Sequence, residues 1–113
     1  MAHYVAAKHG LLGLTRGMAI ELGPHAIRCN LVAPTTTDSP MVHNVEMQSL
    51  SPRSDAKEMT QERWEQMNRR QHLLPTPWID PDDVAAVVAF LASDDARFVT
   101  GSTYEVDAGY TTR

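Results

Sequence analysis

The stretch over residues 26–34 places the strongest constraint on how this chain can fold. It reads Ala-Ile-Arg-Cys-Asn-Leu-Val-Ala-Pro and shows little of the alternation between apolar and polar residues that a half-exposed strand has. Such a pattern is typical of a parallel strand that is covered on both faces. The sequence therefore predicts a strand that needs neighbouring strands on both of its sides.

A long helical stretch over residues 4–22 precedes this strand, and Gly23-Pro24 ends it. Tyr4 and Lys8 are four residues apart, a spacing that stacks two side chains on one face of a helix. A positive charge beside a phenol favours the phenolate, so such a pair can exchange a proton near neutral pH. The other reading is a pair of exposed polar residues on a surface helix, and the spacing alone leaves both readings open.

The second half of the chain predicts one more helix and one more strand. Asp80-Pro81 supplies an N-cap and a first-turn proline for a helix over 81–93, and residues 102–107 read as a strand. Between them and the first strand, residues 35–79 show only a short helix from about Gln61. Two strands make only part of a sheet, so we expect much apolar surface to stay exposed.

Composition excludes several classes of function. A chain of 113 residues holds one domain or part of one, and its net charge of −4, without any long block of like charge, argues against a nucleic-acid surface. No apolar run is long enough to cross a bilayer, and the N-terminus lacks the layout of a signal peptide, so we expect a cytoplasmic chain with no membrane partner. Cys29 reads as a packed structural thiol. The five histidines form no metal-binding cluster, so no metal is predicted.

Motifs along nearly the whole chain resemble the C-terminal half of the short-chain dehydrogenase/reductase family. In that family a Tyr-x-x-x-Lys helix is followed by an Ile/Val-Arg-x-Asn-x-Val-x-Pro strand. The matching strand residues here are Ile27, Arg28, Asn30, Val32 and Pro34. The family's last helix and last strand resemble Phe90–Asp95 and the segment from Thr100 to Gly109. The resemblance implies an α/β fold: the C-terminal part of a Rossmann-like parallel sheet, in the order helix, strand, lid, helix and strand, incomplete without an N-terminal half.

The resemblance also implies site residues and a cofactor. Tyr4 would be the catalytic acid/base, and Lys8 would favour its phenolate and hold the nicotinamide ribose, so both would contact the cofactor. The family's Pro-Gly-x-Val/Ile-x-Thr segment lies over the nicotinamide. Its counterparts here are Pro34, Thr35, Thr37 and Ser39, with Thr35 replacing glycine and Ser39 replacing threonine. Read without the resemblance, this segment is a turn whose Thr, Asp and Pro residues form local hydrogen bonds. The implied cofactor is NAD, with NADP as the alternative.

Four motifs narrow the resemblance to the carveol-dehydrogenase-like, mycofactocin-coupled group. They are Pro-Thr-x-x-Asp-Ser-Pro-Met from Pro34, His-Tyr-Val-Ala-Ala-Lys-His-Gly at residues 3–10, Leu-Pro-x-Pro-Trp at residues 74–78 and Val-Asp-Ala-Gly at residues 106–109. This similarity implies a secondary alcohol or ketone, terpenoid or carveol-like, as the small-molecule substrate, and a homo-oligomer for the full-length protein. Residues 42–71, with Trp64 and Met67, would form a lid over the substrate. A surface segment without a role is the other reading.

The phosphate-binding part of such an enzyme is not visible in the sequence. The glycines never form a G-x-G-x-x-G loop after a strand, and only three residues precede Tyr4. We therefore expect a fragment, from a truncated gene or a start codon assigned too late, that is inactive in isolation. The alternatives are a non-catalytic remnant or dimerisation fragment, and an enzyme similar to the 3-oxoacyl-carrier-protein reductases.

Overall fold

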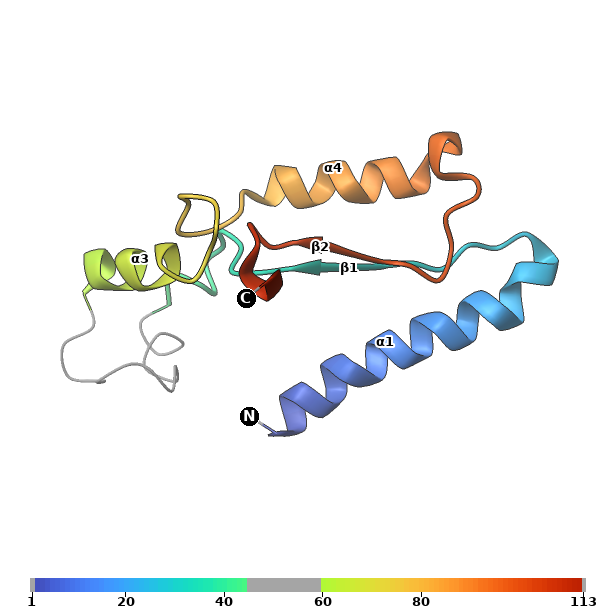
Figure 1. Cartoon of the computed structure of the whole chain (residues 1–113), viewed down its shortest axis with the longest axis horizontal. Coiled ribbons are helices and arrows are strands. Elements are labelled where there is room, and N and C mark those ends of the chain that lie inside the picture. Colours follow the sequence, from blue (N-terminus) through green and yellow to red (C-terminus); the bar gives the residue numbers. More distant parts are fainter. Residues whose placement is uncertain (1, 45–59, 113) are drawn as a thin grey trace. The chain divides into compact units, whose positions relative to one another are not determined.

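The structure, a computed structural model, describes residues 2–44 and 60–112. The chain divides into two compact units, Met1–Ala33 with Ala85–Glu105 and Pro34–Val84 with Val106–Arg113, of which the structure describes only the residues within 2–44 and 60–112. The elements, labelled in Figure 1, are helices α1 (Ala2–Leu22), α3 (Gln61–Arg69) and α4 (Pro81–Ala92), strands β1 (Leu31–Pro34) and β2 (Thr103–Val106), and the 3-10 turns η1 (Gly23–His25), η2 (Asp94–Ala96) and η3 (Tyr110–Thr112).

Strands β1 and β2 pair in parallel. The backbone N–H of Leu31 donates to the Ser102 carbonyl at 2.9 Å, and that of Thr35 donates to the Val106 carbonyl at 3.2 Å. The partner numbers rise together along both strands, which is the parallel pattern, and the two arrows in Figure 1 point the same way. The predicted α/β class with parallel strands is thus confirmed.

Strand β1 is shorter than the stretch over residues 26–34 that the sequence predicts. Ala26 ends η1 in the left-handed conformation, with φ 57°, so the chain is still turning there. The Asn30 side chain then donates to the Val99 carbonyl at 2.9 Å and accepts the Ser102 N–H at 3.2 Å. In front of β1 these side-chain bonds stand beside a backbone bond, in which the Gly101 N–H donates to the Cys29 carbonyl at 2.7 Å.

Helix α4 is capped at both ends by side chains. Asp80 accepts the Asp82 N–H at 2.9 Å, as its N-cap position predicts. At the other end the Arg28 guanidinium donates to the carbonyls of Leu91 and Ser93 at 2.6 and 3.4 Å. The last carbonyls of a helix lack helical partners and carry partial negative charge, so a cation there stabilises the helix. Arg28 thereby ties α4 to the segment that leads into β1.

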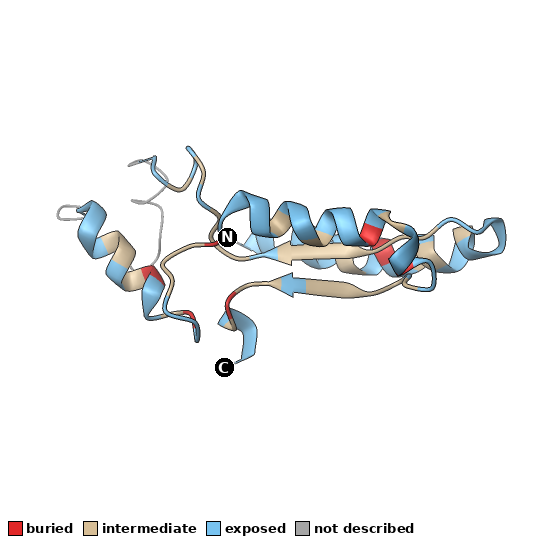
Figure 2. Cartoon of the chain, turned by 90° about the horizontal axis from the view of Figure 1, so that it is seen from above, coloured by how far each residue is buried: buried red, intermediate tan, exposed pale blue. Residues whose placement is uncertain are grey.

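The described residues bury few side chains, as the colours of Figure 2 show. In the first unit the buried residues are Thr15, Leu91 and Ala96, and in the second they are Asn68, His72, Ile79 and Ala108. Helix α1 buries only Thr15 and leaves Ile20 78% and Leu14 57% exposed. The expectation of exposed apolar surface is confirmed.

The glycines of α1 have no close neighbour in the described part of the chain. A Cβ atom added at Gly10, Gly13 or Gly17 meets nothing within 4 Å. A glycine in a helix costs about 1 kcal/mol of stability relative to alanine. The contacts of the described residues therefore do not explain why glycine occupies these three positions.

Within the described residues, none of the helices combines the length and the apolar character that crossing a membrane requires.

Candidate functional site

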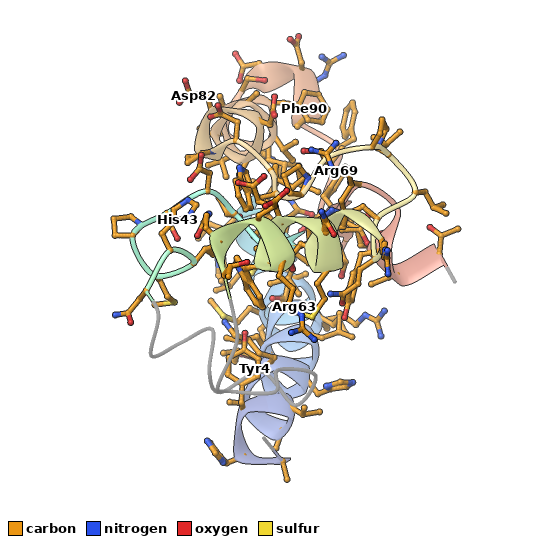
Figure 3. The ribbon with its side chains drawn as sticks, turned by 90° about the vertical axis from the view of Figure 1, so that its left-hand side faces the viewer. Tyr4, His43, Arg63, Arg69, Asp82 and Phe90 are labelled. Atoms are coloured by element: carbon orange, nitrogen blue, oxygen red, sulfur yellow. The ribbon has the colours of Figure 1, made fainter. Side chains whose placement is uncertain are left out.

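Tyr4 and Lys8 lie together on the first turns of α1. The i, i+4 spacing brings the Lys8 Nζ to 5.4 Å from the centroid of the Tyr4 ring, within the range of a cation–π contact. Tyr4 is 53% exposed, and Figure 3 shows it projecting from α1. The structure thus presents a phenol and an ammonium side by side on an accessible helix face.

The loop that follows β1 carries the other predicted site residues, and it belongs to the second unit. Pro34 ends β1 and is exposed, whereas Thr35, Thr37 and Ser39 are half-buried. The Thr37 hydroxyl donates to the Thr35 carbonyl at 3.1 Å, and the Ser39 carbonyl accepts two backbone N–H groups from the turn that follows. The structure therefore brings Thr35 and Thr37 together, while Tyr4 and Lys8 belong to the first unit.

The buried residue Ile79 holds this loop in place. Thr37 pairs with Ile79 in an isolated parallel bridge. The Asp38 N–H donates to the Ile79 carbonyl at 2.8 Å, and the Ile79 N–H donates to the Thr36 carbonyl at 2.9 Å. A loop clamped in this way at the carboxyl end of a strand has a fixed backbone, at the position where open α/β sheets bind ligands.

The start of α3 is linked to the same loop through His43, which Figure 3 labels. The His43 Nε2 lies 2.6 Å from the Asp38 Oδ1, and its Nδ1 lies 3.2 Å from the Gln61 Nε2. The edge of the His43 ring also meets Trp78, with ring centroids 5.0 Å apart. Helix α3 begins at Gln61, as the sequence predicts, and presents Trp64 half-buried. Residues 45–59 of the predicted lid lie outside the described residues.

The segment after α3 packs on the C-terminal turn. The Ala108 carbonyl accepts the N–H groups of Leu73 and Leu74 at 2.8 and 3.1 Å. Gly109 has φ 80°, and a Cβ there would lie 2.7 Å from the Leu73 side chain. Only glycine combines that backbone conformation with so close an approach. The buried His72 sits at this contact, with its ring 6.2 Å from that of Tyr110.

Two residues of this site, His72 and Ile79, escape a reading of the sequence. The sequence places His72 among five scattered histidines and gives Ile79 no role. Their contacts join segments that are more than 30 residues apart in the chain, such as Thr35 with His72. No local pattern signals such a contact.

Comparison with known proteins identifies the family. The sequence profile of a family described as Enoyl-(Acyl carrier protein) reductase matches residues 1–111. A putative short-chain type dehydrogenase/reductase from Mycolicibacterium smegmatis is 44% identical over 107 residues, which are 95% of this chain and 38% of that protein. The chain belongs to the short-chain dehydrogenase/reductase family. The resemblance inferred from the motifs is therefore confirmed.

Two further relatives of this short-chain dehydrogenase/reductase chain point to one group within the family. The (−)-trans-carveol dehydrogenase of Rhodococcus erythropolis is 42% identical over 112 residues, which cover 98% of this chain and 40% of that protein. The crystal structure of carveol dehydrogenase from Mycobacterium avium in complex with NAD superposes with a TM-score of 0.91 at 44% identity, covering 99% of this chain and 40% of that one. The chain thus spans about 40% of the length of the carveol dehydrogenases that it matches.

A carboxylate in the C-terminal turn gives the first testable prediction. Asp107 accepts the Thr111 hydroxyl at 2.7 Å and the N–H groups of Thr111 and Gly109 at 2.8 Å each. The hydroxyl bond from Thr111 is the main cause that lowers the pKa of Asp107 below 3.8; burial opposes it, and the two N–H groups and the charge of His72 add to it. Because the folded state lowers this pKa, the carboxylate stabilises the fold above about pH 3.8, and the contribution is lost as the pH falls through the folded value.

Replacing Thr111 with Ala should therefore raise the pKa of Asp107 toward 3.8, so that the carboxylate contributes less stability above that pH and its contribution is fully lost at a higher pH. The measurement is a carbon NMR titration of the Asp107 carboxyl group. Thr112→Ala is the matched control, since Thr112 donates no bond to Asp107, and it should leave the titration in place. A titration that Thr111→Ala does not move would contradict the assignment of the hydroxyl as the main cause.

Proposed function

We propose that this chain is the C-terminal, catalytic part of an NAD-dependent oxidoreductase that transfers hydride between a secondary alcohol and the nicotinamide. The observation that carries the proposal is the contact of Lys8 with Tyr4 on α1, in a chain whose fold matches an NAD complex of carveol dehydrogenase. The proposed substrate class is a terpenoid or carveol-like alcohol or the corresponding ketone.

Tyr4 is the proposed acid/base. In the direction of oxidation its phenolate oxygen takes the hydroxyl proton of the alcohol, and in reduction the phenol returns that proton to the carbonyl oxygen. Lys8, whose Nζ lies 5.4 Å from the centroid of the Tyr4 ring, is the proposed partner of Tyr4 in this proton transfer. Because Tyr4 is more than half exposed in this chain, its hydroxyl is accessible to a substrate.

The loop after β1 fits the nicotinamide end of the cofactor, which supplies the acceptor or donor of the hydride when it is bound. Four half-buried residues with hydroxyl groups, Thr35, Thr36, Thr37 and Ser39, lie at the carboxyl end of a parallel strand, and two of the loop's backbone groups are bonded to Ile79. Hydroxyl and backbone groups of this kind match the donors and acceptors of a carboxamide. We assign cofactor contact to the residues Tyr4, Lys8, Pro34, Thr35, Thr37 and Ser39.

Helix α3 belongs to the proposed lid over the substrate, and it is the helix of that lid that the structure describes. The bonds from Asp38 through His43 to Gln61 tie its first residue to the loop after β1. Trp64 and Met67 are half-buried on one side of this helix, and they offer an apolar surface to a bulky alcohol. The indole N–H of Trp64 is buried without a hydrogen-bond partner among the described residues.

Helix α1 supports a further part of the proposal, a homo-oligomer of the complete protein. Its exposed apolar side chains and its three uncrowded glycines form a surface on which another helix can approach closely.

Two alternative functions compete with the proposed alcohol dehydrogenase. One is a non-catalytic remnant that acts only through helix α1, and the other is an enzyme similar to the 3-oxoacyl-carrier-protein reductases.

The isolated 113-residue chain should not bind NAD measurably by calorimetry, because its sequence carries no glycine-rich pyrophosphate loop. A chimera in which residues 1–113 replace the aligned C-terminal part of the Rhodococcus erythropolis carveol dehydrogenase should bind NAD and oxidise carveol. A folded chimera that binds no NAD would favour the non-catalytic remnant. A chimera that reduces 3-oxoacyl substrates but not carvone would favour the second alternative.

The catalytic pair is tested in this chimera by separating turnover from binding. Tyr4→Phe keeps the ring and removes the hydroxyl, so kcat should fall by about 10²–10⁴-fold, the usual worth of general acid–base catalysis, while the Kd for NADH stays close to that of the unchanged chimera. Lys8→Ala should weaken NADH binding as well as turnover. Tyr104→Phe and Arg16→Ala are the matched controls. If Lys8→Ala changes neither quantity, the two residues are only neighbours on a helix.

The lid is tested by comparing alcohols of different size in the same chimera. Trp64→Ala removes apolar contact area, so the KM for carveol should rise by roughly tenfold, the cost of losing about 1–3 kcal/mol of apolar contact. The KM for 2-propanol should change much less, because a small alcohol does not reach the indole. Gln66→Ala, an exposed change on the same helix, is the control. Equal effects of Trp64→Ala on both alcohols would remove α3 from the substrate site.

A further inference from the structure

His72 is a buried, titratable side chain for which the proposed reaction has no direct use. It is 4% exposed and belongs to the second unit, in the stretch of sequence that follows α3 and precedes α4. Burying an imidazole is unfavourable unless its nitrogens are hydrogen-bonded, so its partners indicate what the burial serves.

The two ring nitrogens of His72 reach two different segments. Nδ1 lies 2.6 Å from the Thr76 carbonyl oxygen, and Nε2 lies 3.3 Å from the Thr35 hydroxyl. A carbonyl oxygen only accepts, so Nδ1 carries the proton and donates it. In the neutral imidazole Nε2 is then an acceptor, and the Thr35 hydroxyl donates to it.

Contacts with residues other than Thr35 also hold the His72 ring in place. The Thr76 hydroxyl donates to the Trp78 carbonyl at 2.6 Å, which fixes the residue that orients Nδ1. The N–H of Leu73, the residue after His72, is bonded to the Ala108 carbonyl, and Tyr110 meets the ring edge-on. His72 is therefore a fixed point rather than a side chain that follows Thr35.

Thr35 is the first residue of the loop that we assign to the nicotinamide. Its N–H is bonded to Val106 and its carbonyl accepts the Thr37 hydroxyl, so both backbone groups are already in use. The bond to His72 is made by the side chain, through a hydroxyl that glycine, the residue implied here by the family resemblance, does not possess. This departure from the motif thus has a partner in the structure.

We propose that His72 is a positioning residue that holds Thr35, and through it the loop from Pro34 to Ser39, in the geometry that binds the nicotinamide. The proposal rests on the proposed function, since it needs the loop to contact the cofactor. His72 itself touches neither cofactor nor substrate.

The test uses two substitutions that each keep one half of the imidazole. The Asn side chain places a polar group where Nδ1 lies, and the Gln side chain places one where Nε2 lies. In the carveol dehydrogenase chimera, His72→Gln keeps the bond to Thr35 and should leave the Kd for NADH within about threefold, whereas His72→Asn keeps only the bond to Thr76 and should raise it about tenfold, the usual worth of one hydrogen bond. The exposed histidine variant His25→Asn is the control.

A double-mutant cycle identifies the route of the effect. Thr35→Val removes the hydroxyl and keeps the shape, so it should raise the Kd as much as His72→Asn does, and the two changes together should be no worse than either alone. A nitrogen NMR spectrum of the His72 ring should show Nδ1 protonated, and Thr35→Val should shift only the Nε2 resonance. Because this NMR measurement needs only the unchanged chimera and Thr35→Val, it tests the Thr35–His72 bond even if the His72→Asn variant does not fold.

The possible failures are distinct. If the unchanged chimera folds but binds no NADH, the proposed function fails and this inference fails with it. If the chimera binds NADH but Gln and Asn at position 72 weaken binding equally, or the cycle is additive, the proposed function stands and His72 is only a packing residue. A ring protonated on Nε2 in the neutral state would also overturn the inference.

Discussion

The parallel pairing of β1 with β2 is the constraint on which the rest of this structure depends. Because both strands run in the same direction, the loop after β1 and the turn after β2 leave the sheet at the same edge. The bond from Thr35 to Val106 marks the last step of the ladder, and beyond it the two segments meet through His72 and Ala108. The bonds of Thr36 and Asp38 to Ile79 add a second attachment of the proposed nicotinamide loop.

The second unit has a small core, whereas α1 buries almost nothing in the described part of the chain. Backbone bonds join Thr36 and Asp38 to Ile79, and join Leu73 and Leu74 to Ala108. The buried residues of this unit include His72, Ile79 and Ala108. Helix α1 buries only Thr15, and its glycines face open space in the described part of the chain. Tyr4 and Lys8 thus stand on an element whose apolar faces are available for packing, while the proposed cofactor loop is already rigid.

Local chemistry was sufficient to predict the helices, and tertiary contacts decided the rest. Asp80 caps α4, so the start of this helix could be predicted from Asp80-Pro81. Thr60 accepts the Arg63 N–H and caps α3, whose start the sequence placed near Gln61. The start of β1 could not be predicted, because the strand-like stretch from Ala26 looks continuous in the sequence, whereas Ala26 adopts the left-handed conformation and the Asn30 side chain bonds the Val99 carbonyl. The role of His72 was equally out of reach, since Thr35 lies 37 residues away.

The central proposal is that Tyr4 and Lys8 are the catalytic pair of an NAD-dependent enzyme and that the loop after β1 contacts the nicotinamide. A crystal structure of the carveol dehydrogenase chimera with NADH and carvone tests it most directly, through the position of the Tyr4 hydroxyl. We expect this hydroxyl within hydrogen-bond distance of the carvone carbonyl oxygen, about 2.6–3.2 Å, with Lys8 on the nicotinamide ribose and the Thr35–Ser39 backbone on the carboxamide. A structure in which NADH is bound and Tyr4 lies away from the carbonyl, with another side chain in its place, would contradict the account.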